Sequence, residues 1–335
     1  MSNRTKIVWG VIALIAAVWL IVFADKNSKE VSGEPIKIGV IAPLTGPFAD
    51  YGEEIRKGVL VGIGDANVEL IFEDEQCDAK TSVSAFQKLT SIDNVKFIIG
   101  PGCGSPQEAI VPLLSEREVL ALVPSAASRN LFEQSGKYFF NVQYALEDES
   151  KFLAEEIYAR GHMNVALVSY GNAFSHTHAE SFKEAFKGKI ISDVVLLDDN
   201  ANLLPELTKI KALGADAIYS PDVTFFFGGA LAKMEQLGMD VPVFTTYVAE
   251  LPAVIPLVEG VYYSFPEGVE SGVGAVFSLS KQSADILTGL IKECDGESAC
   301  VRDALLSSDD FDAWGTYKRD MIMKRIQGGT AVAAE

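Results

Sequence analysis

Short apolar runs alternate with amphipathic segments along most of this chain. Apolar side chains recur at every second position from Ile36 to Ala42, and Pro43 and Gly46-Pro47 follow, which indicates a strand that ends in a turn. Glu53-Glu54 then suit the positive end of a helix. The same rhythm predicts strands at Val68–Glu73, Lys96–Gly100 and Val119–Pro124, and helices at Glu53–Gly64, Ala79–Ile92 and Pro106–Arg117. Strands that alternate with helices predict a parallel, doubly wound sheet.

A second block with the same rhythm follows. Its expected strands are Asn164–Ser169, Ile190–Leu197, Ala215–Ser220 and Val241–Thr246, and its expected helices are Glu149–Arg160, His176–Lys187, Leu203–Leu213 and Phe225–Leu237. Gly214 and Gly238 stand just past helical runs, where glycine commonly ends a helix. The sequence therefore predicts two α/β lobes, each built on a parallel sheet.

An apolar segment precedes the first lobe. Ile7 to Phe23 carries no charge and follows Arg4 and Lys6, and its length is at the short end of what crosses a bilayer as a helix. Positive charge stays on the cytoplasmic side, so the rest of the chain is expected to face outward. The length favours an uncleaved anchor over a signal peptide cut after Ala24. Residues 1–24 are thus an anchor or a signal peptide, and the polar residues 25–35 are a linker.

Composition limits the classes of function. The 335 residues are 48% apolar, which is enough for two ordinary domains. The formal net charge is -18, and nucleic acid is excluded as a partner because binding it needs clustered Lys and Arg. The chain is expected on the outer face of the cytoplasmic membrane or in the periplasm, with its N-terminal segment in contact with the membrane.

Short segments of this sequence match single enzyme motifs, but the other motifs that each enzyme class requires are missing. Ser278-Leu-Ser-Lys281 fits one motif of serine acyl-enzymes, but the other motifs of that class are missing. His176 and His178 are two residues apart, so on a helix they do not share a face that could hold zinc. We expect no catalysis, no cofactor and no metal site.

The passage from Ile36 to Gly52, IKIGVIAPLTGPFADYG, resembles the start of periplasmic solute-binding proteins of the branched-chain amino-acid (Leu/Ile/Val-binding) family. The resemblance implies a receptor that captures a small polar solute, an amino acid or amino-acid-like carboxylate, between two lobes. It also implies an ABC transporter permease as the partner that receives the solute. Two alternatives stay open: a ligand-sensing module of the same fold that signals to a membrane partner, and a divergent scaffold without a ligand.

The same resemblance implies a three-segment hinge between the lobes. The first crossing is expected at Tyr138–Leu146, the return at Val261–Phe265, and the last at a pair of strands around Tyr317–Ile326, after a helix Ser278–Glu293 has rejoined the first lobe. The implied first lobe comprises residues 36–143 and 267–317. The implied second lobe comprises residues 144–266 and 318–335.

The cysteines agree with the resemblance. Cys77 follows the second expected strand and Cys103 the third, so neighbouring parallel strands would place the two thiols side by side, and the family has a disulfide at the matching positions. Cys294 and Cys300 flank a turn-like insert and would form a second bridge. Four free thiols are the alternative for an exported chain with an even cysteine count.

Loops at the carboxyl ends of the strands carry the expected binding site, because ligands of doubly wound sheets bind there. In the first lobe the resemblance points to Tyr51 and to two loops with the residues Cys103, Gly104, Ser105, Ser125, Ala126, Ala127 and Ser128. Gly104 and Ala127 stand where the family usually carries Ser and Thr that hold the ligand carboxylate, which leaves Ser105, Ser125 and Ser128 as substitutes. These serines also suit strand ends and helix caps.

The second lobe departs from the family pattern. Phe174 matches an aromatic wall of the cleft, and Tyr247 is a further candidate. Val248 stands where the family places a carboxylate for the ligand ammonium. Asp222 and Glu250 are the available replacements for that charge.

Overall fold

The computed structural model describes residues 34–197, 202–270 and 274–334. The predicted membrane segment, residues 1–24, and nearly all of the linker lie outside these residues. Among the described helices, none combines the length and the apolar character that crossing a membrane requires. Residues 37–335 belong to one compact unit, which holds both sheets.

The first sheet has the strand order β2-β1-β3-β4-β5 in the described part of the chain. Its strands are β1 (Ile36–Ala42), β2 (Val68–Asp74), β3 (Phe97–Ile99), β4 (Leu120–Val123) and β5 (Phe139–Asn141). The pairs β1–β3, β3–β4 and β4–β5 are parallel. The connecting helices are α2 (Ala49–Gly62), α3 (Ala79–Ser91), α4 (Gly104–Arg117) and α5 (Asn130–Gln134). Every residue of β3, β4 and β5 is buried, as expected for parallel strands covered by helices on both faces.

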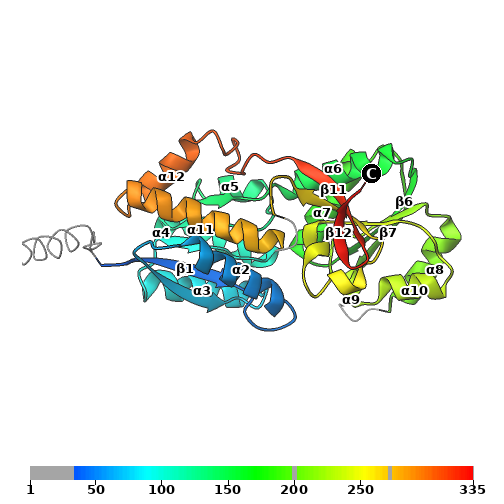
Figure 1. Cartoon of the computed structure of the whole chain (residues 1–335), viewed down its shortest axis with the longest axis horizontal. Helices are drawn as coiled ribbons and strands as arrows, with labels where there is room; N and C mark the ends of the chain where they lie inside the picture. Colours follow the sequence, from blue (N-terminus) through cyan, green and yellow to red (C-terminus); the bar gives the residue numbers. More distant parts are fainter. Residues whose placement is uncertain (1–33, 198–201, 271–273, 335) are drawn as a thin grey trace, which may run out of the picture. The chain divides into compact units, whose positions relative to one another are not determined.

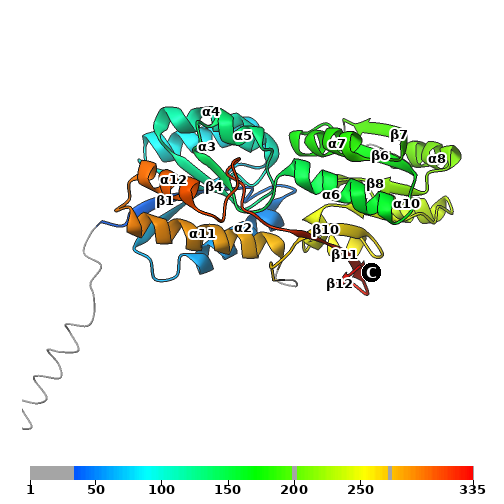
Figure 2. The same ribbon diagram turned by 90° about the horizontal axis from the view of Figure 1, so that it is seen from above.

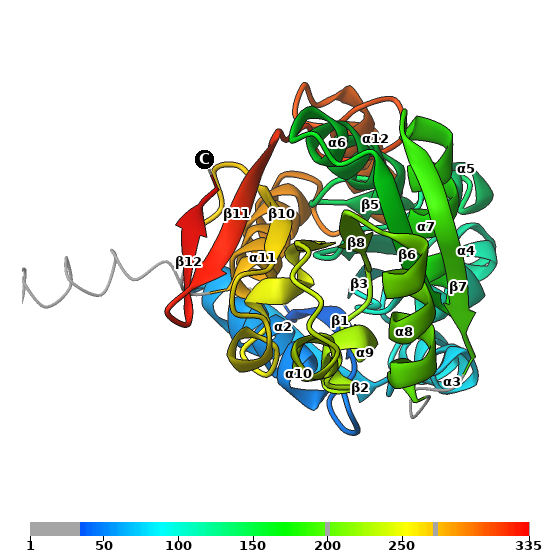
Figure 3. The same cartoon turned by 90° about the vertical axis from the view of Figure 1, so that its right-hand side faces the viewer.

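The second sheet has the described strand order β12-β11-β10-β9-β8-β6-β7. Its strands are β6 (Asn164–Tyr170), β7 (Lys189–Leu196), β8 (Ala217–Tyr219), β9 (Val243–Thr245), β10 (Tyr262–Pro266), β11 (Met321–Gln327) and β12 (Thr330–Ala333). Its helices are α6 (Leu146–Ala159), α7 (Ala173–Ala185), α8 (Leu203–Leu213), α9 (Thr224–Phe227), α10 (Ala230–Gln236) and the 3-10 turns η1 (Tyr247–Glu250) and η2 (Ile255–Leu257). Strands β6 to β10 pair in parallel, whereas β11 and β12 are antiparallel at the edge, as Figure 3 shows. The predicted parallel sheet therefore carries an antiparallel edge.

Helix α11 (Ala275–Glu293) returns the chain to the first sheet. It lies along α2, as both Figure 1 and Figure 2 show, and α12 (Ser298–Ser307) follows it. Glycines permit this close approach: a Cβ on Gly58 would lie 2.3 Å from Phe277 O, and one on Gly62 would lie 2.3 Å from Lys281 O. The contact between α2 and α11 therefore packs α11, which comes late in the chain, against the lobe that contains the first sheet.

The chain passes between the two sheets after β5, after β10 and after α12, within the residues that the structure describes. These crossings lie side by side. Tyr317 N donates to Asn141 O across 2.8 Å, and Glu267 N donates to Asp320 O across 2.8 Å. The first and second crossings are thus each hydrogen-bonded to the third.

Several element boundaries differ from the sequence prediction. The segment Tyr138–Leu146 is not all crossing, because Phe139–Asn141 forms β5. Likewise Val261–Phe265 is mostly strand β10, which pairs with β9 and β11. The predicted helix Phe225–Leu237 is divided at Gly228-Gly229, where Gly229 has a φ of +69°. The last strand pair, expected around Tyr317–Ile326, starts at Met321, and Gly328-Gly329, both with positive φ, form the turn between β11 and β12.

Both predicted disulfides are present. Cys77 and Cys103 are joined with their Cα atoms 5.3 Å apart, and Cys294 and Cys300 with theirs 5.6 Å apart. The first bridge joins the loop after β2 to the start of α4. It closes 26 residues of chain, which by loop entropy stabilises the fold by roughly 3.5 kcal/mol.

Candidate functional site

A pocket of about 350 Å³ lies at the carboxyl ends of strands from both sheets. The first lobe contributes the loop after β1, the start of α4 and the loop after β4. The second lobe contributes the loops after β6, β8 and β9. The described lining residues are Phe48, Tyr51, Cys77, Gly102, Cys103, Gly104, Ser105, Ala126, Tyr170, Gly171, Asn172, Phe174, Leu197, Asp222, Val223, Thr224, Tyr247, Val248 and Leu251.

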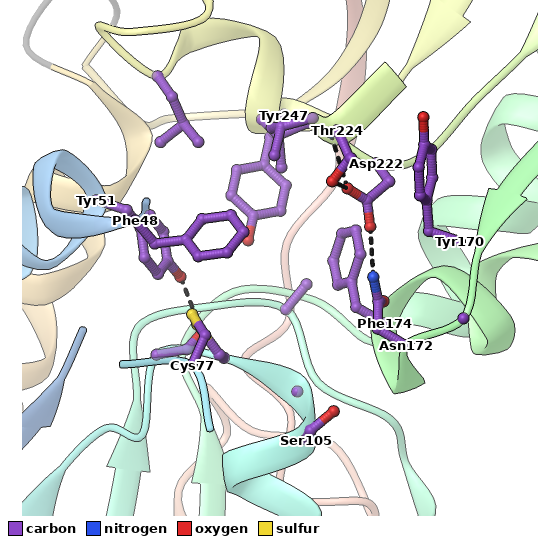
Figure 4. A pocket seen from close by; sticks show the side chains of 18 of the residues that line it. Phe48, Tyr51, Cys77, Ser105, Tyr170, Asn172, Phe174, Asp222, Thr224 and Tyr247 are labelled. Atoms are coloured by element: carbon purple, nitrogen blue, oxygen red, sulfur yellow. Dashed lines mark hydrogen bonds between the residues drawn. A yellow bond between two sulfur atoms is a disulfide. The ribbon is translucent and has the colours of Figure 1, made fainter. Parts of the chain in front are cut away.

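Asp222 brings the charge to this pocket. Thr224 donates to Asp222 Oδ1 from its backbone N across 2.9 Å and from its hydroxyl across 2.7 Å. Asn172 Nδ2 donates to Oδ2 across 2.7 Å, and Figure 4 shows these three side chains together. Asp222 is 6% exposed and is the only charged residue among the described lining residues. All three of these donors are uncharged, so the negative charge is oriented but not neutralised.

The Asn172 side chain has two roles in this arrangement. Its Oδ1 accepts a hydrogen bond from Ser175 N across 2.8 Å and thereby caps α7, while its Nδ2 holds Asp222. A helix cap commonly satisfies one of the free N–H groups of the first turn. Here the cap also fixes the orientation of the pocket carboxylate.

The first-lobe wall is held by Tyr51 and Glu75. The Tyr51 hydroxyl donates to Gly102 O across 3.0 Å, and burial raises the pKa of Tyr51 to about 12, although the Ser125 and Tyr247 hydroxyls act against that shift. Glu75 Oε1 accepts hydrogen bonds from Gly102 N at 3.0 Å and Cys103 N at 3.1 Å. Burial also raises the pKa of Glu75 well above its ordinary value, because the charged form loses its hydration.

Aromatic rings form much of the remaining wall. In Figure 4 the Tyr247 side chain points toward Phe48 and Tyr51. Phe174, in the first turn of α7, packs on the His178 ring with their centroids 4.5 Å apart. A cavity with apolar walls and a few placed polar groups is typical of a small-molecule site.

Most of the predicted site residues come together at this pocket. The structure places at its lining Tyr51, Cys103, Gly104, Ser105, Ala126, Phe174, Asp222 and Tyr247. Gly104 also lies against the second lobe, since a Cβ on it would stand 3.4 Å from Phe174 N.

The other predicted residues do not line the pocket. The side chains of Ser125, Ser128 and Glu250 are hydrogen-bonded to other residues, and Ala127 is buried. Ser125 Oγ accepts a hydrogen bond from Gln107 Nε2 across 2.9 Å, and Ser128 Oγ donates to Glu147 Oε1 across 2.5 Å. Ala127 is buried, and its carbonyl accepts a hydrogen bond from Leu146 N. Glu250 Oε1 accepts hydrogen bonds from the Tyr263 hydroxyl at 2.6 Å and Lys324 Nζ at 2.8 Å. Of the two candidate replacements for the family carboxylate, only Asp222 faces the pocket.

Sequence reasoning missed several lining residues, notably Phe48, Tyr170, Asn172, Thr224 and Leu251. Phe48 follows the turn that ends the first predicted strand, and Asn172 follows the end of a predicted strand. The rule that ligands bind beyond the carboxyl ends of parallel strands would have found Asn172 had it been applied to the second lobe. Thr224 has no signal of its own, since its role depends on Asp222.

A metal centre is not favoured by the described side chains. One cluster, Glu75, Cys77 and Cys103, has ligand atoms within 4.8 Å of one another. Both sulfurs are joined in the disulfide, which leaves no thiolate to bind a metal. The pocket is thus equipped for reversible binding by hydrogen bonds, one carboxylate and apolar contact.

Comparison with known proteins agrees with this architecture. A family model described as "Periplasmic binding protein" matches residues 35–267. A Pseudomonas aeruginosa protein that binds leucine, isoleucine, valine, threonine and alanine is 26% identical over 247 residues, which are 68% of this chain and 63% of that protein. A Leu/Ile/Val-binding protein homolog of Brucella melitensis is 28% identical over 211 residues, 59% of this chain and 55% of that protein. The chain therefore spans only about three-fifths of the length of these relatives.

Solved structures show the same fold. A leucine-binding protein of Thermotoga maritima aligns with a TM-score of 0.81 at 18% identity, covering 90% of this chain and 98% of the other. A solute-binding protein of an R. palustris ABC transporter, in complex with benzoate, aligns with a TM-score of 0.79 at 15% identity, covering 89% and 95%. The family match covers most of the chain, and both lobes have their counterparts in these structures. The chain belongs to the periplasmic binding protein family.

Proposed function

We propose that the protein captures an amino acid with an apolar side chain between its lobes and presents it to an ABC transporter. The observation that carries the proposal is the buried Asp222 carboxylate, held by neutral donors in an otherwise uncharged pocket. A ligand ammonium group would complete its hydrogen bonds and neutralise its charge. The proposal assigns binding and no catalysis to this chain.

The charge of the pocket distinguishes between the ligand classes of related proteins. The relatives named above bind amino acids, among them leucine, isoleucine, valine, threonine and alanine, or benzoate. A benzoate anion would meet Asp222 with no Lys or Arg among the described lining residues to offset the repulsion. A zwitterionic amino acid would place its ammonium at Asp222 and its carboxylate toward neutral donors of the first lobe. The aromatic walls favour an apolar side chain.

The first lobe supplies the neutral donors in this proposal. Ser105 and the backbone of the α4 start line the pocket opposite Asp222. The first N–H groups of a helix lack partners within the helix and attract anionic oxygens. We assign the ligand carboxylate to this helix start, with Ser105 as its hydroxyl donor.

Closure of the lobes is the proposed mechanism. We take residues 36–143 and 267–317 as the first lobe, residues 144–266 and 318–335 as the second, and the three adjacent crossings as the hinge. The ligand would favour the closed form because only there do both lobes contact it.

We further propose that the chain works on the outer face of the cytoplasmic membrane. The support is the uncharged apolar run Ile7–Phe23 behind Arg4 and Lys6. The N-terminal sequence of protein recovered from membranes tests this: an intact start supports an anchor, and a start after Ala24 supports a cleaved signal peptide.

A thermal-shift screen of the full chain tests the binding function. The panel contains the apolar amino acids, their deaminated carboxylates, short amides, benzoate and a sugar. We expect an apolar amino acid to raise the melting temperature, because a ligand that binds only the folded state stabilises it. A rise with benzoate or the sugar alone would contradict the proposed ligand class.

A further inference from the structure

A buried carboxylate stands directly behind the pocket. Glu149, on α6, is 0% exposed. Its Oε1 accepts hydrogen bonds from the Tyr144 hydroxyl at 2.8 Å, from Tyr247 N at 3.3 Å and from the Ser264 hydroxyl. Its Oε2 lies 3.4 Å from His178 Nε2. Neither Oε2 nor His178 Nε2 has a hydrogen-bond partner among the described residues, so a proton between them would satisfy both atoms.

The donors come from segments that are distant in the sequence. Tyr144 lies in the first crossing between the sheets, and Ser264 lies in β10, immediately before the second crossing. Tyr247 lines the ligand pocket, and its ring packs edge-on against Tyr144 with their centroids 6.3 Å apart. One carboxylate thus ties the pocket to two of the crossings.

The other titratable groups around Glu149 are neutral near pH 7. Burial lowers the pKa of His178 to about 3, and burial raises the pKa values of Tyr144, Tyr219 and Tyr247 well above their ordinary value. His178 Nδ1 is contacted by the Ser150 hydroxyl at 2.7 Å and the Tyr219 hydroxyl at 3.3 Å. On the adjacent strand β11, Lys324 is paired with Glu250 at 2.8 Å. None of the ion pairs among the described residues joins Glu149 to Lys or Arg.

Glu149 is therefore the member of this cluster that changes charge near neutrality. Burial raises the pKa of Glu149 to about 7, while the hydrogen bonds from Ser264, Tyr144 and Tyr247 oppose the shift. A proton on Oε2 would be donated to His178 Nε2. Without that proton, Oε2 and Nε2 have no hydrogen-bond partner among the described residues, and the buried negative charge is not neutralised.

We propose that Glu149 is a positioning residue that couples the ligand pocket to the interlobe crossings, and that proton loss from this carboxyl group loosens the coupling. The inference rests on the proposed function only in treating the pocket as the ligand site. In the protonated state, the three donors to Oε1 and the bond from Oε2 to His178 hold Tyr247 and the crossings in the observed arrangement. In the ionised state, the buried charge and the unpaired His178 Nε2 destabilise this arrangement, and the lobes reorient more readily.

Hydrogen exchange of the ligand-free full chain tests the proposal. Protection of the peptide containing Tyr247, corrected for intrinsic exchange, is compared between about pH 5.5 and about pH 8.5, on either side of the expected titration. We expect about fivefold stronger protection at the lower pH in the wild type, because the observed arrangement binds the proton more tightly, and less than about a twofold change in Glu149→Gln. Glu155→Gln is the matched control, since Glu155 is an exposed residue of the same helix.

The outcomes are distinguishable from those of the ligand screen. The same pH response in Glu149→Gln as in the wild type, or none in either, would overturn the coupling while leaving solute binding intact. If Glu149→Gln fails to fold, Ser264→Ala, which removes one donor, is measured instead. Ser264→Ala should lower the protection at about pH 8.5 more than at about pH 5.5. Equal losses at both pH values would overturn the proposal.

Discussion

Asn172 Nδ2 donates a hydrogen bond to Asp222 Oδ2 across 2.7 Å, so the cap of α7 also orients the carboxylate that follows β8. The carboxyl ends of β6 and β8, two neighbouring parallel strands, thus place Asn172 and Asp222 together at the pocket. The negative charge of Asp222 has no cationic partner among the described residues. In the proposed function, the ammonium group of the ligand supplies the missing partner.

Replacement of Asp222 tests this role. In Asp222→Asn the side chain keeps its shape but loses the charge, and we expect the affinity for the best amino acid of the screen to fall about ten- to hundredfold. Titration calorimetry of both chains measures the change. Asp240→Asn, at an exposed position remote from the pocket, is the control and should bind as the wild type does. Unchanged affinity in Asp222→Asn would remove Asp222 from the site.

The Glu149 carboxyl predicts a pH dependence of stability. Its pKa is about 7 in the folded state and near its ordinary value of 4.5 in the unfolded state, so the folded state binds the proton more tightly. Its contribution to stability is therefore complete below about pH 4.5 and is lost as the pH rises through about 7. Relative to Glu149→Gln, the wild type should lose roughly 3 kcal/mol over this interval.

Denaturant unfolding of both chains at a series of pH values measures this difference. The comparison with the Gln variant matters because His178, whose pKa is lowered to about 3, contributes the opposite slope in acid. A stability difference that stays constant from about pH 5 to about pH 8 would show that Glu149 does not titrate in this range.

The correct sequence predictions rest mainly on patterns among residues that are close to one another in the chain. The strand and helix rhythm and the loops at the strand ends follow from local patterns and from the rule for parallel sheets, and the disulfide pairing from the strand positions together with the family resemblance. Asp222 was a candidate because it ends a strand. The same reasoning could not separate Asp222 from Glu250, because the partner that occupies Glu250 is Lys324, which lies 74 residues further along the chain.

The short strands were harder to predict for a related reason. Phe139–Asn141 and Tyr262–Pro266 are apolar segments whose pairing partners, β4, β9 and β11, decide that they are strands and not connections. The Glu149 cluster was also beyond local patterns. It assembles side chains from α6, α7, β8, β10 and η1, and only the packed fold brings them together.

The disulfides should differ in their contribution to stability. Replacing Cys77 and Cys103 by Ser should lower the free energy of unfolding by roughly 3.5 kcal/mol, because the closed loop spans 26 residues. The same change at Cys294 and Cys300, which are 6 residues apart, should cost roughly 2 kcal/mol. Chemical denaturation under non-reducing conditions gives both values. A larger loss from the second pair would contradict the entropic account.

The contact between α2 and α11 predicts opposite effects for two glycines. Gly58→Ala should destabilise the protein by roughly 1–3 kcal/mol, because the new methyl group would overlap Phe277 O. Gly289→Ala, in α11 with nothing within 4 Å of the new Cβ, should stabilise it by up to about 1 kcal/mol. Melting temperatures of both variants test the pair. A neutral Gly58→Ala would mean that the helices are less closely packed than the structure shows.

The central claim is that Asp222 selects a ligand with an ammonium group, and titration calorimetry of the full chain tests it most directly. Leucine and its deaminated analogue 4-methylpentanoate are compared, since they share the carboxylate and the apolar side chain. The account predicts that leucine binds at least about tenfold more tightly, because only leucine can donate a charge-assisted hydrogen bond to Asp222. Equal or tighter binding of 4-methylpentanoate would contradict the account.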